Sequence, residues 1–260
     1  MKLLNWLAPQ WALKRASARH ALAMYEAAKP TRTFKPKRSA GTADLNVQLS
    51  GRSLREQCRH LDENHDIVTG LFDRLEERVV GGPGIGVEPI PRSLTGEVHT
   101  ELAAKIKAAW AEWSLKPEAS GEYTRPQVER HVCRTWLRDG ECLAQMLTGH
   151  VSNYKHLNDV PFALELIEPD YLPFDLNDEA SGILQGVQRN AWRRITAFHL
   201  LKSNPANVYG SLSLKTKSVP AENRLYIAHR KRFNQNRGVP MLHSTLIRLA
   251  EIKDYEESER

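Results

Sequence analysis

The spacing of apolar residues changes near the middle of this chain of 260 residues, and the change limits the folds open to it. Before Asp139 and Gly140, apolar residues recur every three or four positions, which indicates amphipathic helices. After this point they alternate with polar residues, and turns rich in Gly, Asn, Asp and Pro separate the alternating runs, which indicates strands joined by hairpins. The sequence therefore predicts an α+β fold in which N-terminal helices precede a mainly antiparallel sheet.

Three helices are expected before the sheet. Residues 53–56 form a capping-box pattern that predicts a helix start, and one buried face follows as far as Val79. The second helix is expected at residues 95–113, and a second capping box at residues 124–127 predicts the third. The face expected to be buried in the second helix carries Val98, Leu102, Ile106 and Trp113. Five strands are expected at residues 142–147, 162–167, 183–188, 195–201 and 225–229.

A basic, polar loop at residues 230–237 follows the last expected strand and leads into one more helix. Gly238 allows a positive φ, and Pro240 has the φ that suits entry into a helix, so the helix should begin near Met241. No glycine, asparagine or proline stop signal precedes Arg260, so we expect the chain to be part of a longer polypeptide.

The apolar residues of this last helix occupy more than one face. Leu242, Leu246 and Leu249 form one stripe, whereas Ile247 and Tyr255 point to the other side. The body of one chain cannot easily cover both faces. We therefore expect the helix to leave the α+β body, with Tyr255 and the later turns exposed.

The positive charge is concentrated at the N-terminus. The whole chain has a formal charge of +6 at pH 7, but residues 1–40 hold nine Lys or Arg and a single acid, Glu26. The sequence thus divides into a basic extension, residues 1–43, an α+β body, residues 44–218, and a last strand, loop and helix, residues 219–260. A basic strip in the extension could bind nucleic acid by displacing counterions, or could contact a neighbouring subunit instead. The candidate nucleic-acid contacts are Lys29, Arg32, Lys35, Lys37 and Arg38.

Several other classes of function receive no support from the residues. No run approaches 18 apolar residues, which argues against a membrane span. The three cysteines have no paired spacing and are expected to be reduced packing residues. The glycine-rich residues 81–86 follow a helix and precede an extended segment, which suits a helix end rather than a phosphate loop. No catalytic or metal-binding motif is present, so we expect neither enzymatic activity nor a cofactor.

Three stretches in the right order resemble the lambda-type portal proteins of tailed bacteriophages. The run VPAENRLYIAHRKRFNQNRGVPMLHSTL, residues 219–246, is similar to a family segment in which a strand precedes "Q.RGVP" and a helix. Residues 183–205, with the strand at 165–173, resemble a family hairpin and the strand before it. Residues 64–89 resemble a helix that runs into glycine-rich sequence.

This resemblance implies a structural subunit of a homo-oligomeric ring at one vertex of a phage capsid. Such a ring, of about a dozen copies, surrounds the channel through which double-stranded DNA is packaged and ejected. The other expected partners are the terminase motor, the capsid and the head-tail connector proteins, with assembly in the host cytoplasm and final location in the virion. The residues implied at the subunit interface or stem are Gln235, Arg237, Gly238, Leu242, Leu246, Ile247, Leu249 and Tyr255. The family's clip, channel-lining helix and crown would lie beyond residue 260.

Two other interpretations remain open at this stage. A stand-alone nucleic-acid-binding protein or nuclease would use the basic arm as its footprint, and a nuclease would also need acids or histidines clustered in one cleft. An interaction module without nucleic acid would cover all of its apolar residues within one chain.

Overall fold

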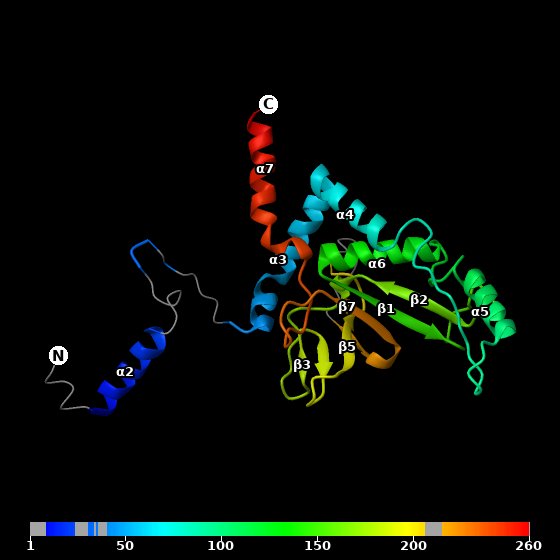
Figure 1. Cartoon of the computed structure of the whole chain (residues 1–260), viewed down its shortest axis with the longest axis horizontal. Helices are drawn as coiled ribbons and strands as arrows, with labels where there is room; N and C mark the ends of the chain where they lie inside the picture. Colours follow the sequence, from blue (N-terminus) through cyan, green and yellow to red (C-terminus); the bar gives the residue numbers. More distant parts are fainter. Residues whose placement is uncertain (1–8, 24–30, 34, 36–40, 206–214, 260) are drawn as a thin grey trace. The chain divides into compact units, whose positions relative to one another are not determined.

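A computed structural model of the chain describes residues 9–23, 31–33, 35, 41–205 and 215–259 (Figure 1). The chain divides into two compact units, Met1–Gly41 and Thr42–Arg260. The first unit contains helix α2 (Pro9–Ala23). The second contains all the other helices and strands described, so the expected segments 44–218 and 219–260 lie in one unit.

Three helices of the second unit pack against one another. They are α3 (Ala43–Asn64), α4 (Asp66–Val79) and α6 (Arg125–Asp139). Cys58 and Leu61 of α3, Phe72 of α4 and Leu137 of α6 are buried in one apolar cluster. The helical spacing of these residues therefore predicts their burial correctly, because each helix turns its apolar face to the other two.

The first of these helices begins earlier than the capping-box pattern predicts. Thr42 is the residue before the helix, and its hydroxyl accepts a hydrogen bond from the Leu45 amide at 3.2 Å. Ser53 lies in the interior of α3, so the prediction of a helix start there is wrong. The continuous helix expected up to Val79 is also broken at His65, whose extended backbone ends α3 and precedes α4.

The capping box at Thr124 is confirmed. Gln127 Oε1 accepts from the Thr124 amide at 2.8 Å, and α6 follows directly. The glycine-rich segment lies against this helix, since Arg125 Nη1 donates to the Ile85 carbonyl at 2.9 Å. Gly81 has φ 75° and follows the end of α4, as a helix-terminating glycine does.

Helix α5 (Thr100–Trp113) is shorter than expected and exposes most of its apolar stripe. A tight turn forms before it, because Ser93 and Glu97 are hydrogen-bonded through their backbones and Gly96 adopts φ 89°. Trp113 is buried and its indole nitrogen donates to the Phe162 carbonyl at 2.9 Å. The expected burial of Val98, Leu102 and Ile106 is wrong, because all three are exposed.

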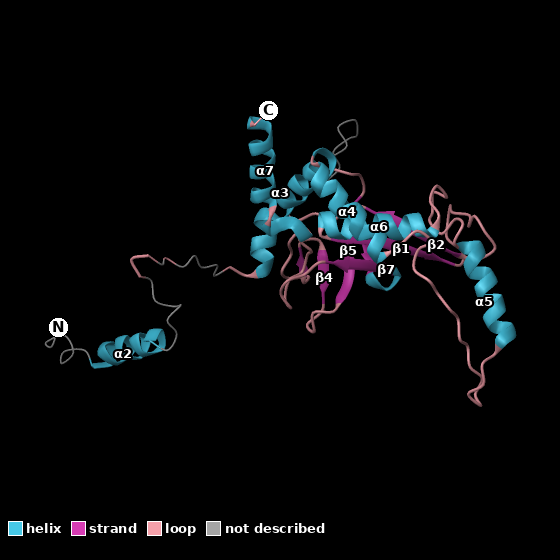
Figure 2. Ribbon diagram, turned by 45° about the horizontal axis from the view of Figure 1, so that its top comes forward, coloured by secondary structure: helices cyan, strands magenta, loops and turns pink. Residues whose placement is uncertain are grey.

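Two antiparallel sheets follow the helices (Figure 2). The first has the order β2-β1-β7 and the second the order β3-β4-β5-β6. In the first sheet Leu143 pairs with Ile167 on one side and Tyr226 on the other. The strands are β1 (Glu141–Thr148), β2 (Phe162–Ile167), β3 (Ile183–Leu184), β4 (Val187–Arg189), β5 (Ile195–Leu201), β6 (Thr216–Pro220) and β7 (Arg224–Ala228).

The two sheets share an apolar core. Leu143 of β1 lies in the same buried cluster as Val187 of β4, Phe198 of β5 and Val219 of β6. The four residues at the start of β1 are all buried, which shows that both faces of this strand are covered there. The α+β class, with helices first and antiparallel sheets after them, is therefore confirmed.

Two strand predictions differ in detail from the structure. The strand expected at residues 183–188 is a tight hairpin, because Gln185 and Gly186 adopt φ values of 54° and 77° and reverse the chain. Strand β6 was not expected as a strand, and it pairs with β5 along the edge of the second sheet.

The C-terminal helix is built in two parts. A short 3-10 turn (η4, Met241–Ser244) precedes helix α7 (Leu246–Ser258), which extends away from both sheets (Figure 1). Leu242 and Leu246 are buried in the helical cluster, with Leu249 partly buried beside them. Ile247 is 75% exposed and Tyr255 65% exposed, so the expected exposure is confirmed.

Two further observations concern chemistry expected from composition. Cys58, Cys133 and Cys142 are free and buried, and burial raises the pKa of the Cys58 and Cys142 thiols to about 12. Among the described helices, none is long and apolar enough to cross a membrane.

Candidate functional site

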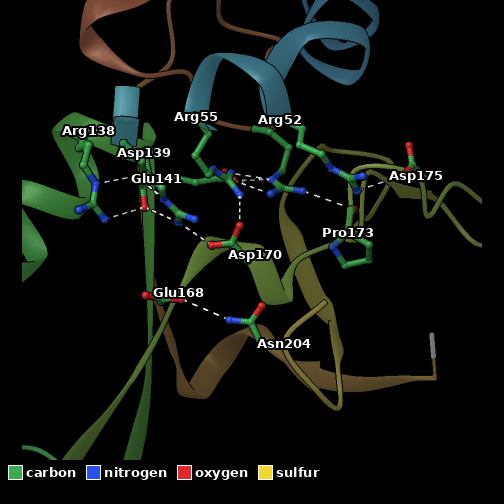
Figure 3. Close-up of polar contacts among 12 residues, drawn as sticks. Arg52, Arg55, Arg138, Asp139, Glu141, Glu168, Asp170, Pro173, Asp175 and Asn204 are labelled. Carbon is green, nitrogen blue, oxygen red and sulfur yellow. Dashed lines mark hydrogen bonds and ion pairs between the residues drawn. The ribbon is translucent and has the colours of Figure 1, made fainter. Parts of the chain in front are cut away.

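A buried carboxylate at the start of β1 connects the sheets, helix α3 and the loop before α7. Glu141 has no exposed surface and accepts hydrogen bonds from Arg55 at 2.7 Å and from the Tyr226 hydroxyl at 2.5 Å. Figure 3 shows Asp139 and Glu141 between Arg138 on one side and Arg55 on the other. Several charged and neutral hydrogen-bond donors offset the free-energy cost of removing this carboxylate from water.

Arg237 is the main partner of this carboxylate and is itself completely buried. Its Nε lies 3.0 Å from both Glu141 oxygens, and its Nη2 also donates to Oε1. Its Nη1 donates to the Gln185 carbonyl at 2.9 Å, and its guanidinium lies 4.2 Å from the centre of the Phe174 ring. Arg237 therefore ties the loop before α7 to β1 and to the β3–β4 turn.

The electrostatic environment of Glu141 and Arg237 favours the charged form of both side chains. Burial alone would raise the pKa of Glu141, but the charges of Arg237 and Arg55 outweigh it and lower the pKa to about 2. Burial raises the pKa of Tyr226, and the neighbouring negative charge of Glu141 adds to this effect. The tyrosine thus stays protonated and donates to the carboxylate.

Two glycines let the backbone of this loop cross the start of β1. A Cβ on Gly238 would lie 2.0 Å from the Gly140 carbonyl oxygen, and a Cβ on Gly140 would lie 2.3 Å from the Val239 carbonyl carbon. Gly140 also has φ 87°, which side chains disfavour. The Gly238 amide donates to Glu141 Oε2 at 3.1 Å, so the close approach completes the hydrogen bonding of the carboxylate.

A second layer of ion pairs joins the helices around this centre. Arg59 donates to Asp139 at 2.7 Å and to Asp170 at 2.5 Å. Burial works against the charge of Asp139, but hydrogen bonds from Arg59 and Arg138 lower its pKa. These contacts hold the end of α6 against α3.

The arrangement is suited to fixing the direction of a helix rather than to chemistry. Every oxygen of Glu141 is occupied by donors from the same chain, and the carboxylate is closed to solvent. The loop that carries Arg237 continues directly into η4 and α7. We therefore treat the cluster of Glu141, Arg237, Arg55, Tyr226, Gly140 and Gly238, called here the α7 anchor, as the candidate functional site.

Residues 28–260 match the model of the family described as phage portal protein, lambda family. The chain belongs to the lambda family of phage portal proteins. A separate search of curated proteins finds none that matches the chain. Portal proteins are structural components of the capsid vertex. As a family they form oligomeric rings and have capsid and packaging proteins as partners.

The portal chain separates the eight residues expected at an interface or stem into an interior and an exposed group. Gln235 and Arg237 are buried, and Gly238 lies against Gly140 in the α7 anchor. Leu242 and Leu246 are also buried, at the start of the helix. Ile247 and Tyr255 are exposed along α7, with Leu249 between the two groups. Only the exposed members offer surface to a neighbouring molecule.

The five basic residues expected to contact nucleic acid lie in the other compact unit. Arg32 and Lys35 are exposed. Lys29, Lys37 and Arg38 lie outside the described residues.

The sequence of this portal chain does not predict the acid at the centre of the anchor. Glu141 stands next to the predicted strand 142–147, yet its partners Arg55 and Arg237 are 86 and 96 positions away. The one local signal is Asp139-Gly140-Glu141, in which two acids flank a glycine at the point where the apolar period changes.

Proposed function

We propose that this chain is one subunit of a ring at a capsid vertex, through which double-stranded DNA is packaged and later ejected. The observation that carries the proposal is the match of residues 28–260 to the portal family. The projecting helix supports it, because exposed Ile247 and Tyr255 give neighbouring copies an apolar surface to contact. A closed ring needs such head-to-tail contacts between copies.

The proposed ring is a dodecamer that works with the terminase motor, the capsid and the head-tail connector proteins. Assembly takes place in the host cytoplasm, and the finished ring is part of the virion. In this scheme the α7 anchor fixes the angle at which α7 leaves the body. A constant angle matters in a ring, since an error in one subunit is repeated at every interface.

The proposed role requires no turnover by this chain, because the terminase motor supplies ATP hydrolysis. Purified chain is therefore expected to show neither ATP hydrolysis nor DNA cleavage with Mg²⁺ or Mn²⁺. The structural assignment would be contradicted if the chain hydrolysed ATP or cleaved DNA and a single substitution in a polar pocket abolished that activity.

The ring assembly can be tested with substitutions on the exposed face of α7. The full chain should form a closed oligomer in native mass spectrometry and sedimentation velocity, and Ile247→Ser with Tyr255→Ser should shift it toward the monomer. The control Glu256→Gln changes an exposed polar residue of the same helix, about 180° around the helix axis from Ile247, and should leave assembly intact. Equal oligomer populations in the unchanged chain, the double variant and the control would show that α7 is not part of the interface.

We also propose that the basic strip contacts DNA phosphates through Lys29, Arg32, Lys35, Lys37 and Arg38. The exposure of Arg32 and Lys35 supports this role, because exposed cations can replace the counterions of DNA.

A further inference from the structure

A second concentration of positive charge lies in the folded unit, where two segments far apart in sequence meet. One is the turn between β4 and β5, residues 190–194, and the other is the loop at residues 230–234 after β7. Arg193 donates to Asn234 Oδ1 across the contact, and Arg189 Nε donates to Asn236 Oδ1 at 2.6 Å. The exposed residues of this arginine surface are Trp192, Arg193, Arg194, Arg230, Lys231, Arg232 and Phe233.

Hydrogen bonds within the chain hold the turn in shape. Asn190 Oδ1 accepts from the amides of Trp192 and Arg194, each at 3.0 Å. Arg189 Nη1 donates to the Arg193 carbonyl at 2.6 Å, and Arg193 adopts φ 62°. The turn is therefore ordered by its own contacts, and it presents its side chains outward in a defined arrangement.

The two aromatic residues of the surface contribute nothing to the apolar cores. Trp192 is 90% exposed and Phe233 is 109% exposed. Aromatic side chains of this size usually bury much of their area, because burial is their main contribution to stability. Each lies next to arginine in sequence, Trp192 before Arg193 and Phe233 after Arg232.

The cations of the surface also differ from the arginines of the interior. Arg59, Arg134 and Arg237 each pair with one or more carboxylates. No described carboxylate forms an ion pair with Arg193, Arg194 or Arg230. Burial and the nearby charges of Arg230 and Arg193 lower the pKa of Arg189, and the opposing effects of Tyr226 and Asp44 do not cancel this shift. Such a cluster costs free energy unless an anion offsets its charge.

We propose that the arginine surface binds nucleic acid, with its cations on the phosphates and with Trp192 and Phe233 stacked on unpaired bases. Cations that follow the phosphates, interleaved with exposed aromatic rings, are the combination that single-stranded nucleic acid requires. A duplex supplies the phosphates without free base faces, so it should engage the cations alone. This surface is separate from the basic strip at residues 29–38, and its assignment does not depend on ring assembly.

The contribution of the cations can be measured by salt dependence. In the full chain, Arg194→Gln with Lys231→Gln removes two exposed cations whose side chains form no hydrogen bond or ion pair among the described residues. The slope of log affinity against log salt for a DNA duplex is negative, and its magnitude should decrease by about 1.8, since each phosphate contact contributes about 0.9. Lys105→Gln with Lys107→Gln makes the same change of charge on exposed α5 residues and should leave the slope unchanged. Equal slopes for both variants would overturn the proposal.

The aromatic contribution is tested with a single strand of the same length. Trp192→Ala should weaken single-strand binding by about tenfold, the usual size of one lost stacking contact, and duplex binding much less. The control Leu94→Ala removes a fully exposed apolar side chain elsewhere and should leave both affinities unchanged. Unchanged single-strand affinity of the Trp192 variant would exclude stacking.

Contact with a second copy of this chain is the competing use of such a surface. If Arg194→Gln with Lys231→Gln abolished self-association but left the DNA slope unchanged, the surface would belong to a protein contact and the proposal would fail. Oligomer mass is measured on the same samples, so a failure of DNA binding at this surface is distinguishable from a failure of ring assembly.

Discussion

At the scale of single residues, the stability of the folded unit depends strongly on one carboxylate. Replacing Glu141 by Gln removes the charge that offsets Arg237 and Arg55, and both guanidinium groups are buried. Breaking a buried pair in this way costs about 3–5 kcal/mol of the free energy of unfolding. Urea unfolding should show this loss for Glu141→Gln. The control Glu165→Gln, on an exposed residue of β2, should change the free energy by less than about 0.5 kcal/mol.

The same carboxylate makes stability depend on pH in a defined direction. Its pKa is lowered from the ordinary value of 4.5 to about 2 in the folded state. Between these values the unfolded chain holds more protons than the folded chain, so acid favours unfolding. The contribution of Glu141 is fully present above pH 4.5 and is lost as the pH falls to about 2. Unfolding followed at a series of pH values should show this decline, and a chain equally stable across the window would contradict it.

The anchor shows where prediction at the residue scale ends. Gln235, Arg237 and Gly238 are implied by the resemblance, but sequence spacing does not reveal that Arg237 and Gly238 donate to Glu141 of β1 or that Gln235 donates to the Arg237 carbonyl. A charged residue is ordinarily expected at the surface. The interior position of Arg237 is possible because two other segments of the chain bring Glu141 and Phe174 to it.

At the scale of elements, the crossing of two backbones at Gly140 and Gly238 is the contact that places α7. Gly238→Ala would force a Cβ against the Gly140 carbonyl, with no flexible side chain that could move aside. We expect a loss of more than about 2 kcal/mol in the free energy of unfolding, because the backbone itself must shift. Gly82→Ala is a matched control, since nothing lies within 4 Å of the added Cβ. Similar unfolding curves for both variants would show that the crossing is loose.

Element predictions succeeded where one local signal was sufficient. The capping box at Thr124 and the strand at residues 162–167 need only neighbouring residues, and both are correct. The segment expected as one strand at residues 183–188 is a hairpin, because Gln185 and Gly186 adopt positive φ values that apolar spacing does not reveal. The exposed stripe of α5 was also misread, since helical spacing shows that a face is apolar but not whether another element of the chain covers it.

At the scale of the whole chain, two separate basic regions are proposed to contact nucleic acid, one in each compact unit. The unit Thr42–Arg260 contains three apolar clusters and the α7 anchor. Removing residues 1–41 should therefore leave its thermal unfolding unchanged, since the apolar clusters and ion pairs found among the described residues all join residues of this unit. Unfolding at a lower temperature would show that the first unit supports the second.

The same deletion tests whether the two basic regions act independently. Each neutralised phosphate contributes about 0.9 to the salt slope of duplex binding, so independent regions contribute additively. Deletion of residues 1–41 should lower the slope by the number of phosphates the strip contacts. Arg194→Gln with Lys231→Gln should then lower it by a further 1.8 or so, the same decrement as in the full chain. If the second decrement vanished in the shortened chain, the arginine surface would bind DNA only when the strip is bound, and DNA binding by the two regions would be coupled.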